Sequence, residues 1–157
     1  MIGTFNSPIG LIAIRADENG IRSMVFVEED KSIEAYDPSP IVERCIAQLT
    51  EYFSGTRTKF DLPLAPDGTE FEKQVWEELE RIPFGETCSY LDIAKRLDNA
   101  KAIRAVGRAN GANPIAIIIP CHRVIGSDGR LAGYSGGLWR KRWLLDHEAR
   151  IARTVLF

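Results

Sequence analysis

The sequence lacks any long hydrophobic run. No stretch of about 18 consecutive apolar residues occurs. Residues 1–5 also have neither the basic region nor the apolar region of a secretory signal peptide. We therefore expect a soluble protein of the cytoplasm with no membrane association. With 157 residues, 45% of them hydrophobic, the chain is long enough to bury a core and to fold unaided.

Cysteine and histidine are scarce and far apart. The sequence has only 3 Cys (Cys45, Cys88 and Cys121) and 2 His (His122 and His147), and no C-x-x-C pair. This spacing favours neither a zinc site nor a disulfide framework, and no Gly-rich nucleotide loop is present. We therefore expect reduced thiols, no metal and no cofactor.

Charge is low in total but unevenly distributed. The net charge is −2, yet residues 1–70 hold 6 basic and 12 acidic side chains, whereas residues 93–143 hold 10 basic and only 2 acidic ones. An excess of +8 in one region is typical of a face that binds a polyanion such as DNA. The alternative is a solvated surface that is merely rich in Lys and Arg.

The N-terminal half is predicted to be a small α/β domain. Extended, Ile- and Val-rich segments at 2–6, 9–16 and 21–27 are separated by turns, which indicates an antiparallel meander. A helix is expected to begin after Ser39-Pro40 and to end before Gly55, with Cys45 as a core residue. Two prolines and a glycine in residues 62–68 indicate a linker, so we predict domains at 1–66 and 67–157.

The C-terminal half is predicted to be mostly helical. Thr69 with Glu72 has the spacing of a capping box, and Ser89 with Asp92 caps a second, short helix. A third helix over 101–109 places Arg104 and Arg108 one turn apart, among small residues that permit close approach. This pattern predicts a winged-helix-like helix-turn-helix, although small helix pairs also occur without DNA.

A thiol beside an imidazole follows the most apolar stretch of the chain. Residues 115–119 are predicted to form a buried strand that Pro120 ends, with Asn113 tying the preceding helix to it. Cys121 would then lie at the floor of a cleft, where His122 and Arg123 lower the pKa of its thiol. The alternative is an inert, buried Cys. A closing helix from Leu138 is expected to expose its basic residues Arg140, Lys141 and Arg142.

These motifs resemble those of the O6-alkylguanine-DNA alkyltransferases. The resemblance rests on Pro-Cys-His-Arg-Val at 120–124, Asn113-Pro114 eight residues before the thiol, and Tyr-Ser-Gly-Gly at 134–137, and it covers residues 69–150 closely. It implies an N-terminal α/β domain and a C-terminal helical domain that binds the minor groove and flips a damaged nucleotide.

The resemblance also implies roles for individual residues. Cys121 would accept the alkyl group, His122 would act as its base through a water, and Glu148 would orient the imidazole. Arg104 would fill the gap left by the flipped base. Expected pocket residues are Tyr90, Asn113, Val124, Tyr134 and Ser135. Expected DNA contacts, besides Arg104, are Ser89, Ala105, Arg108 and Arg123.

The expected function is therefore irreversible, stoichiometric transfer of an alkyl group from O6-alkylguanine in double-stranded DNA to Cys121, by a monomer. Whether O4-alkylthymine is also accepted stays open. Two alternatives come from other classes. A non-catalytic sensor of alkylation damage would keep the basic helix pair without needing the thiol, and a Cys-His hydrolase would use Cys121 and His122 without needing the basic region.

Overall fold

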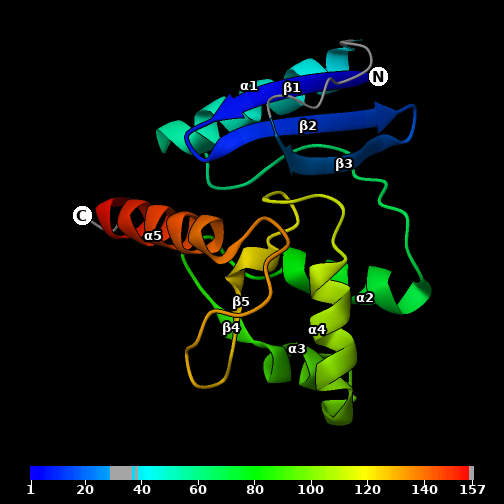
Figure 1. Cartoon of the computed structure of the whole chain (residues 1–157), viewed down its shortest axis with the longest axis vertical. Coiled ribbons are helices and arrows are strands. Elements are labelled where there is room, and N and C mark those ends of the chain that lie inside the picture. The colour runs from blue at the N-terminus through cyan, green and yellow to red at the C-terminus, as the bar shows by residue number, and fades with distance from the viewer. Residues whose placement is uncertain (29–36, 38, 156–157) are drawn as a thin grey trace. The chain divides into compact units, whose positions relative to one another are not determined.

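The structure is a computed structural model that describes residues 1–28, 37 and 39–155. The chain divides into two compact units, Met1–Asp67 and Gly68–Phe157 (Figure 1). Each unit is described by itself.

The first unit is built on a three-stranded antiparallel sheet. Its strands are β1 (Ile2–Ser7), β2 (Gly10–Asp17) and β3 (Gly20–Val27), in the order β1-β2-β3. The predicted meander is confirmed. The alternation of the strands turns Ile12, Ile14 and Met24 into the core.

One helix covers this sheet, as predicted. Helix α1 (Pro40–Ser54) begins at Ser39, whose side chain accepts a hydrogen bond from the amide of Val42, and ends at Gly55 in the left-handed conformation (φ 87°). Cys45 is fully buried, with its sulfur 3.7 Å from that of Met24. The expectation that Cys45 is a core residue is therefore confirmed.

The second unit is mostly helical, which confirms the predicted fold class. Its helices are α2 (Glu70–Glu80), α3 (Tyr90–Arg96), α4 (Ile103–Gly111) and α5 (Leu138–Val155). Two short 3-10 helices, η1 (Ala100–Ala102) and η2 (Cys121–Arg123), and two two-residue strands complete it: β4 (Cys88–Ser89) and β5 (Val124–Ile125), which pair in parallel.

Local sequence signals start the first two of these helices. Thr69 with Glu72, and Ser89 with Asp92, both form complete capping boxes, as their spacing predicted. Helix α3 ends at Arg96, and the left-handed Asp98 (φ 55°) turns the chain toward α4.

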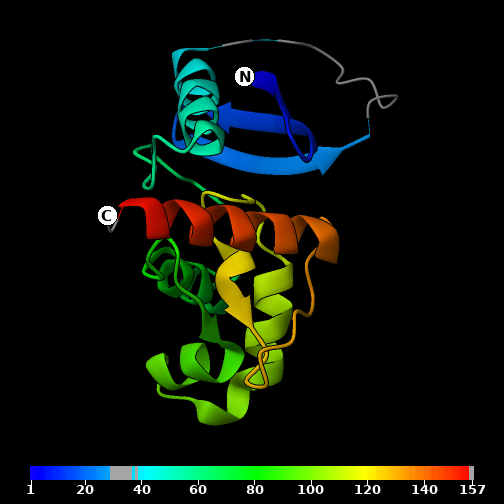
Figure 2. The ribbon, with the colours of Figure 1, turned by 90° about the vertical axis from the view of Figure 1, so that its left-hand side faces the viewer.

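Helices α3 and α4 form the predicted helix pair, and α2 packs against both of them (Figure 2). Val106 and Ala109 of α4 are buried, and the indole N–H of Trp76 donates to the carbonyl of Ala109 at 2.9 Å. Ala102, just before α4, is half-buried. The opposite face of α4 is left exposed.

The predicted strand over residues 115–119 is wrong, although the predicted burial is right. Ile115, Ile117 and Ile119 are all buried, but the segment is a series of turns. Ile117 has a φ of 71°, and the Ile119 amide donates to the Ile115 carbonyl at 3.2 Å. Apolar runs of this length do not by themselves distinguish a strand from another buried conformation.

Candidate active site

Cys121 is the first residue of η2, on a turn that is fixed from both sides. Its amide donates to the Ile119 carbonyl at 2.8 Å, and its own carbonyl accepts from the amide of Val124. Val124 is fully buried and pairs through β5 with Cys88 of β4, just before α3. The reactive segment is thereby linked to the start of the helix pair. The thiol residue itself is only 5% exposed.

Asn113 closes the turn that leads to Cys121. Its side-chain amide donates to the carbonyls of Ile115 at 3.2 Å and Ile119 at 2.8 Å, while its oxygen accepts from the Ile115 amide at 3.0 Å. These bonds replace the backbone pairing that a strand would have supplied. A hydrogen bond from Asn113 also favours the charged form of Cys121.

Asn110 is a supporting residue that the sequence did not reveal. It is 2% exposed, and its side-chain amide lies 3.4 Å from the Cys121 carbonyl, which it hydrogen-bonds. The available signal was its position four residues after Val106, which places it on the same face of α4, because a polar residue on the buried face of a helix requires a partner.

His122 and Glu148 form a buried pair. The imidazole Nε2 lies 2.8 Å from Glu148 Oε2, and the two side chains are 0% and 1% exposed. A carboxylate at Nε2 favours a proton there and leaves Nδ1 as the proton acceptor. Among the described residues, Nδ1 has no hydrogen-bond partner. This orientation suits His122 to take up a proton at Nδ1.

Arg123 does not occupy the position predicted for a DNA contact. Its guanidinium donates to both oxygens of Glu148, at 2.7 and 3.0 Å, and to the Ile82 carbonyl at 2.8 Å. It also lies over the ring of Phe84, 5.6 Å from the centroid. The side chain is 9% exposed. Its contacts are therefore internal, and we reassign Arg123 to holding Glu148.

Glu148 is held ionised by these two partners. Burial raises its pKa, but the charge and hydrogen bond of His122 and those of Arg123 lower it more, so the pKa lies well below the ordinary value. An ionised Glu148 beside Nε2 favours the His122 tautomer that carries its proton on Nε2.

The thiol of Cys121 departs from the expectation of a lowered pKa. Burial raises the pKa of Cys121 above its ordinary value, and the hydrogen bond from Asn113 and the charge of Lys141 oppose that rise. Arg123 is turned toward Glu148 and is not among the groups that lower the pKa of Cys121. The cation that opposes the rise is instead Lys141, predicted to be exposed on its helix but in fact 0% exposed.

Two tyrosines lie within electrostatic range of the thiol. Burial raises the pKa of both Tyr90 and Tyr134. The charge of ionised Cys121 raises both pKa values further, by a smaller amount. The Tyr90 hydroxyl donates to the Ala132 carbonyl at 2.9 Å, whereas the buried Tyr134 hydroxyl has no hydrogen-bond partner among the described residues. Ser135 follows on an exposed turn, and no described contact joins it to Cys121.

The predicted DNA-contacting residues other than Arg123 lie on the helix pair. Arg104 and Arg108 of α4 are exposed, and neither forms an ion pair within the described part of the chain. Ala105 is half-buried between them, and Ser89 caps α3. Two unpaired cations beside a small residue present a surface that a phosphate backbone can approach closely.

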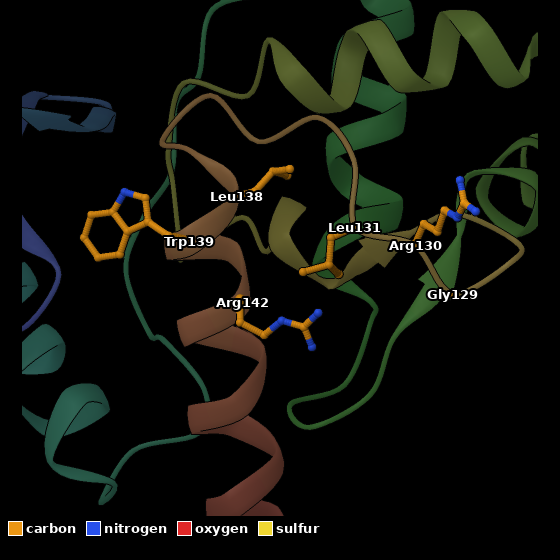
Figure 3. A pocket seen from close by; sticks show the side chains of 6 residues that line it. All are labelled: Gly129, Arg130, Leu131, Leu138, Trp139 and Arg142. Carbon is orange, nitrogen blue, oxygen red and sulfur yellow. The ribbon is translucent and has the colours of Figure 1, made fainter.

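A shallow groove lies between the loop after β5 and the first turns of α5 (Figure 3). Arg130 and Arg142 add positive charge there, and Leu138 and Trp139 are 48% and 58% exposed. Its lining does not include Cys121 or any predicted site residue. The lining residues are Gly129, Arg130, Leu131, Leu138, Trp139 and Arg142.

Within residues 1–28, 37 and 39–155, no three His, Cys, Asp or Glu side chains lie close enough to hold a metal ion. No helix of that part of the chain is long and apolar enough to cross a membrane.

Both halves of the chain match models of one protein family. Residues 1–66 match "6-O-methylguanine DNA methyltransferase, ribonuclease-like domain", and residues 70–150 match "6-O-methylguanine DNA methyltransferase, DNA binding domain". A relative from Methanosarcina acetivorans, named methylated-DNA–protein-cysteine methyltransferase, is 49% identical over 148 residues, which cover 92% of this chain and 95% of the relative.

Solved structures agree with these matches. The crystal structure of Mycobacterium tuberculosis O6-methylguanine methyltransferase is 42% identical with a TM-score of 0.84, covering 96% of this chain and 94% of that one. The structure of Mycobacterium tuberculosis OGT in complex with DNA is 44% identical with a TM-score of 0.85, covering 94% and 92%. On sequence and fold together, this chain belongs to the 6-O-methylguanine DNA methyltransferase family.

Proposed function

We propose that this protein repairs alkylated DNA by moving the alkyl group from O6 of guanine to the sulfur of Cys121. The observation that carries the proposal is the buried thiol next to His122, whose Nε2 is fixed by Glu148 at 2.8 Å. In a chain of this family, that arrangement supplies a nucleophile and a proton acceptor with a defined tautomer.

The reaction is a displacement at a saturated carbon. The Cys121 thiol gives up its proton, taken toward Nδ1 of His122 through a water, and the thiolate lone pair forms a bond to the alkyl carbon. The bond between that carbon and O6 breaks, and its electron pair stays on guanine. Guanine takes up one proton, which balances the one that the thiol lost. Sulfur is suited to this step because a thiolate is a strong, polarisable nucleophile.

Tyr90, Tyr134 and Ser135 are proposed to serve the leaving base. Hydroxyl donors directed at the base would stabilise the negative charge that builds on it as the bond to O6 breaks. The backbone carbonyls near Cys121 and Val124 would accept from its exocyclic amine. The interaction of ionised Cys121 with both tyrosines supports their closeness to the reacting sulfur.

DNA binding is assigned to the helix pair of the second unit, which we propose as the DNA-binding and alkyl-transfer domain at 67–157. The exposed Arg104 and Arg108 of α4, with Ala105 between them, would approach the minor groove, and Ser89 would contact the backbone. Flipping a nucleotide costs about a few kcal/mol of lost stacking. Arg104 would recover part of that by filling the vacancy.

The other two functions receive less support. A hydrolase needs a base that reaches the nucleophile directly, and adjacent residues such as Cys121 and His122 seldom form such a pair. A sensor without chemistry would have no use for the fixed pair of His122 and Glu148. Family membership also favours a transferase over both.

We further propose that the protein acts as a monomer in the cytoplasm. The mechanism needs a reduced Cys121, and all three cysteines are free thiols, which is the state that reducing compartments maintain.

The proposal is tested by incubating the protein with a duplex that carries one O6-methylguanine and analysing the Cys121 peptide by mass spectrometry. We expect that peptide to gain one methyl group and the DNA to contain unmodified guanine. Binding to the damaged duplex without any mass change would identify a sensor. Unmodified guanine in the DNA together with free methanol, and no modified peptide, would identify a hydrolase.

A further inference from the structure

Asn110 carries a buried acceptor that the fold leaves unused. The residue is 2% exposed, on the face of α4 that also buries Val106. Its side-chain Nδ2 donates to the Cys121 carbonyl at 3.4 Å. In the part of the chain that the structure describes, its Oδ1 is buried without a hydrogen-bond partner. Buried polar atoms normally have partners, so Oδ1 indicates a donor that arrives with a ligand.

The orientation of the Asn110 amide is set by its neighbour. A backbone carbonyl only accepts hydrogen bonds, so the NH2 group faces the Cys121 oxygen, and exchanging the two ends would bring two acceptors together. Asn113 supports the same turn but is used at both ends: its Nδ2 donates to the Ile115 and Ile119 carbonyls, and its Oδ1 accepts from the Ile115 amide. The unused acceptor is therefore a feature of Asn110 and not of the turn.

The stability of the turn does not account for Asn110. The Cys121 carbonyl already accepts from the Val124 amide, so an apolar residue at position 110 would leave that carbonyl paired. A half-satisfied buried amide is less favourable than an apolar side chain in the same place. The presence of Asn110 on the buried face of α4 therefore favours a part in binding.

The chemistry of the base identifies the donor that Oδ1 can receive. In O6-alkylguanine the alkyl group fixes the tautomer in which N1 carries no hydrogen. The ring nitrogens N1, N3 and N7 are then all acceptors, and the exocyclic amine is the one N–H donor on the base. An acceptor beside the thiol can therefore form an ordinary hydrogen bond with this base only through that amine.

The hydrogen bonds already present favour Asn110 over the Cys121 carbonyl as the acceptor for this amine. That carbonyl has two lone pairs, and the Val124 amide and Asn110 Nδ2 occupy both. Asn110 Oδ1 belongs to the same amide group and has its whole capacity free. Asn110 and Cys121 are enclosed together, at 2% and 5% exposure, so a base that reaches the thiol lies next to Asn110.

We propose that Asn110 is a specificity-determining residue: its Oδ1 accepts a hydrogen bond from the exocyclic amine of the flipped guanine, while its Nδ2 stays on the Cys121 carbonyl. This inference rests on the proposed function and refines it, since the side chain takes the acceptor role beside Cys121. The second hydrogen of the amine remains for the carbonyl near Val124. One amide group thereby connects the recognised edge of the base to the backbone of the nucleophile.

The test compares two duplexes that differ only in this amine, one with O6-methylguanine and one with O6-methylhypoxanthine, by the rate of methyl transfer to Cys121. Wild type should react faster with the guanine lesion. In Asn110→Leu, which replaces the amide with an apolar side chain, that preference should fall about fivefold, because a hydrogen bond is lost with the guanine lesion alone. Stacking differences between the lesions are common to both proteins and cancel from the comparison.

Val106→Ala is the matched control, since Val106 is buried on the same face of α4 and has no polar group. Any slowing in this variant should affect both lesions equally and leave the preference unchanged. Equal losses on both lesions in Asn110→Leu would indicate a structural part or a bound water, and would overturn the inference. An unchanged preference with no loss of rate would overturn it as well.

A second measurement leaves Asn110 in place and covers the case in which Asn110→Leu folds poorly. Cys121→Ser, which should bind without reacting, can be held on each duplex while carbon-13 NMR follows the side-chain carbonyl of labelled Asn110. We expect that carbon to shift downfield on the O6-methylguanine duplex, where Oδ1 accepts a hydrogen bond, relative to its position on the O6-methylhypoxanthine duplex. The same chemical shift on both duplexes would contradict the inference.

Failure of the inference is distinguishable from failure of the proposed function. No methyl transfer to wild-type Cys121 from either duplex would remove the function. Transfer from both duplexes, with a preference for the guanine lesion that Asn110→Leu retains, would leave the function standing and remove the inference.

Discussion

Cys121 differs from the other two thiols in the charges around it. Burial alone raises the pKa of Cys45 to about 12, and burial raises that of Cys88 as well. Only Cys121 combines a buried cation, an amide donor and a neighbouring imidazole. Replacing Cys121 with Ser should therefore abolish alkyl transfer and leave DNA binding nearly intact, because the hydroxyl is a far weaker nucleophile of almost the same shape.

The matched controls for that substitution are Cys45→Ser and Cys88→Ser, assayed by transfer of labelled methyl from duplex. Both should transfer near the wild-type rate, with Cys45→Ser less stable because its position is fully buried. Transfer by Cys121→Ser at a rate comparable to wild type would disprove the assignment.

Glu148 gives the protein a predictable response to acid. The pKa of Glu148 in the folded chain lies below its unfolded value of about 4.3, so its stabilising contribution is complete above that pH and declines as the pH falls below it. Glu148→Gln should lower the free energy of unfolding by about 3–5 kcal/mol at pH ~7, since the Arg123 charge is left buried. That deficit should shrink as the pH falls below about 4.

Urea unfolding of wild type and Glu148→Gln across this pH range measures the effect. Glu86→Gln is the control, because Glu86 is exposed in the same unit. A deficit that stays constant from neutral to acid pH would show that Glu148 is not held ionised in the folded state.

Several residue roles were accessible from the sequence and others were not. The proximity of His122 and Glu148 followed from a resemblance, and the structure joins them. The internal role of Arg123 was missed, since adjacency to Cys121 suggested a shared electrostatic role, whereas its side chain extends to Glu148 and Ile82. Lys141 was also missed, although it shares the i, i+3, i+7 spacing of Leu144 and Glu148, which marks one helix face.

At the scale of elements, helix α4 is predicted to act in base flipping as well as in binding. Arg104→Ala should slow repair of O6-methylguanine in duplex DNA far more than reaction with the free base O6-benzylguanine, because the free base has no stack to leave. Rates of Cys121 modification by the two substrates measure this. Equal losses on both would indicate a pocket or folding role for Arg104.

Arg108, one turn away on the same exposed face, serves as the matched comparison. If it contacts a phosphate, Arg108→Ala should weaken duplex binding and reduce the magnitude of the slope of log K against log salt by about 1. The ratio of the duplex rate to the free-base rate should change less than in Arg104→Ala. An unchanged salt slope would place Arg108 away from the DNA.

The elements themselves were predictable where local signals defined their ends. Ser39, Thr69 and Ser89 each cap a helix at the position that their spacing indicated. The turns over residues 115–119 were not predictable in this way, because the apolar composition fixes burial but not conformation. What decides the conformation is the side chain of Asn113, which bonds both ends of the segment.

At the scale of the whole molecule, the account predicts a protein that acts once. The product of transfer is a thioether, which has no electrophilic carbonyl for water to attack and is not cleaved by thiol–disulfide exchange. The spent protein also holds an added alkyl group beside the turn that Asn113 closes. We expect it to melt at a lower temperature than the fresh protein, by about 2–4 °C for each kcal/mol lost.

Differential scanning calorimetry of the methylated and unmethylated forms checks this expectation. A methylated protein that melts at the same temperature as the fresh one would show that the added alkyl group does not strain the fold.

The most direct test of the central claim is a titration of the protein with an excess of duplex that carries O6-methylguanine, with the methyl group followed to the protein by mass spectrometry. We expect a rapid burst that ends at one methyl group per chain, located on Cys121, with the remaining duplex unrepaired. Continued repair beyond one equivalent, or a methyl group on any other residue, would contradict it.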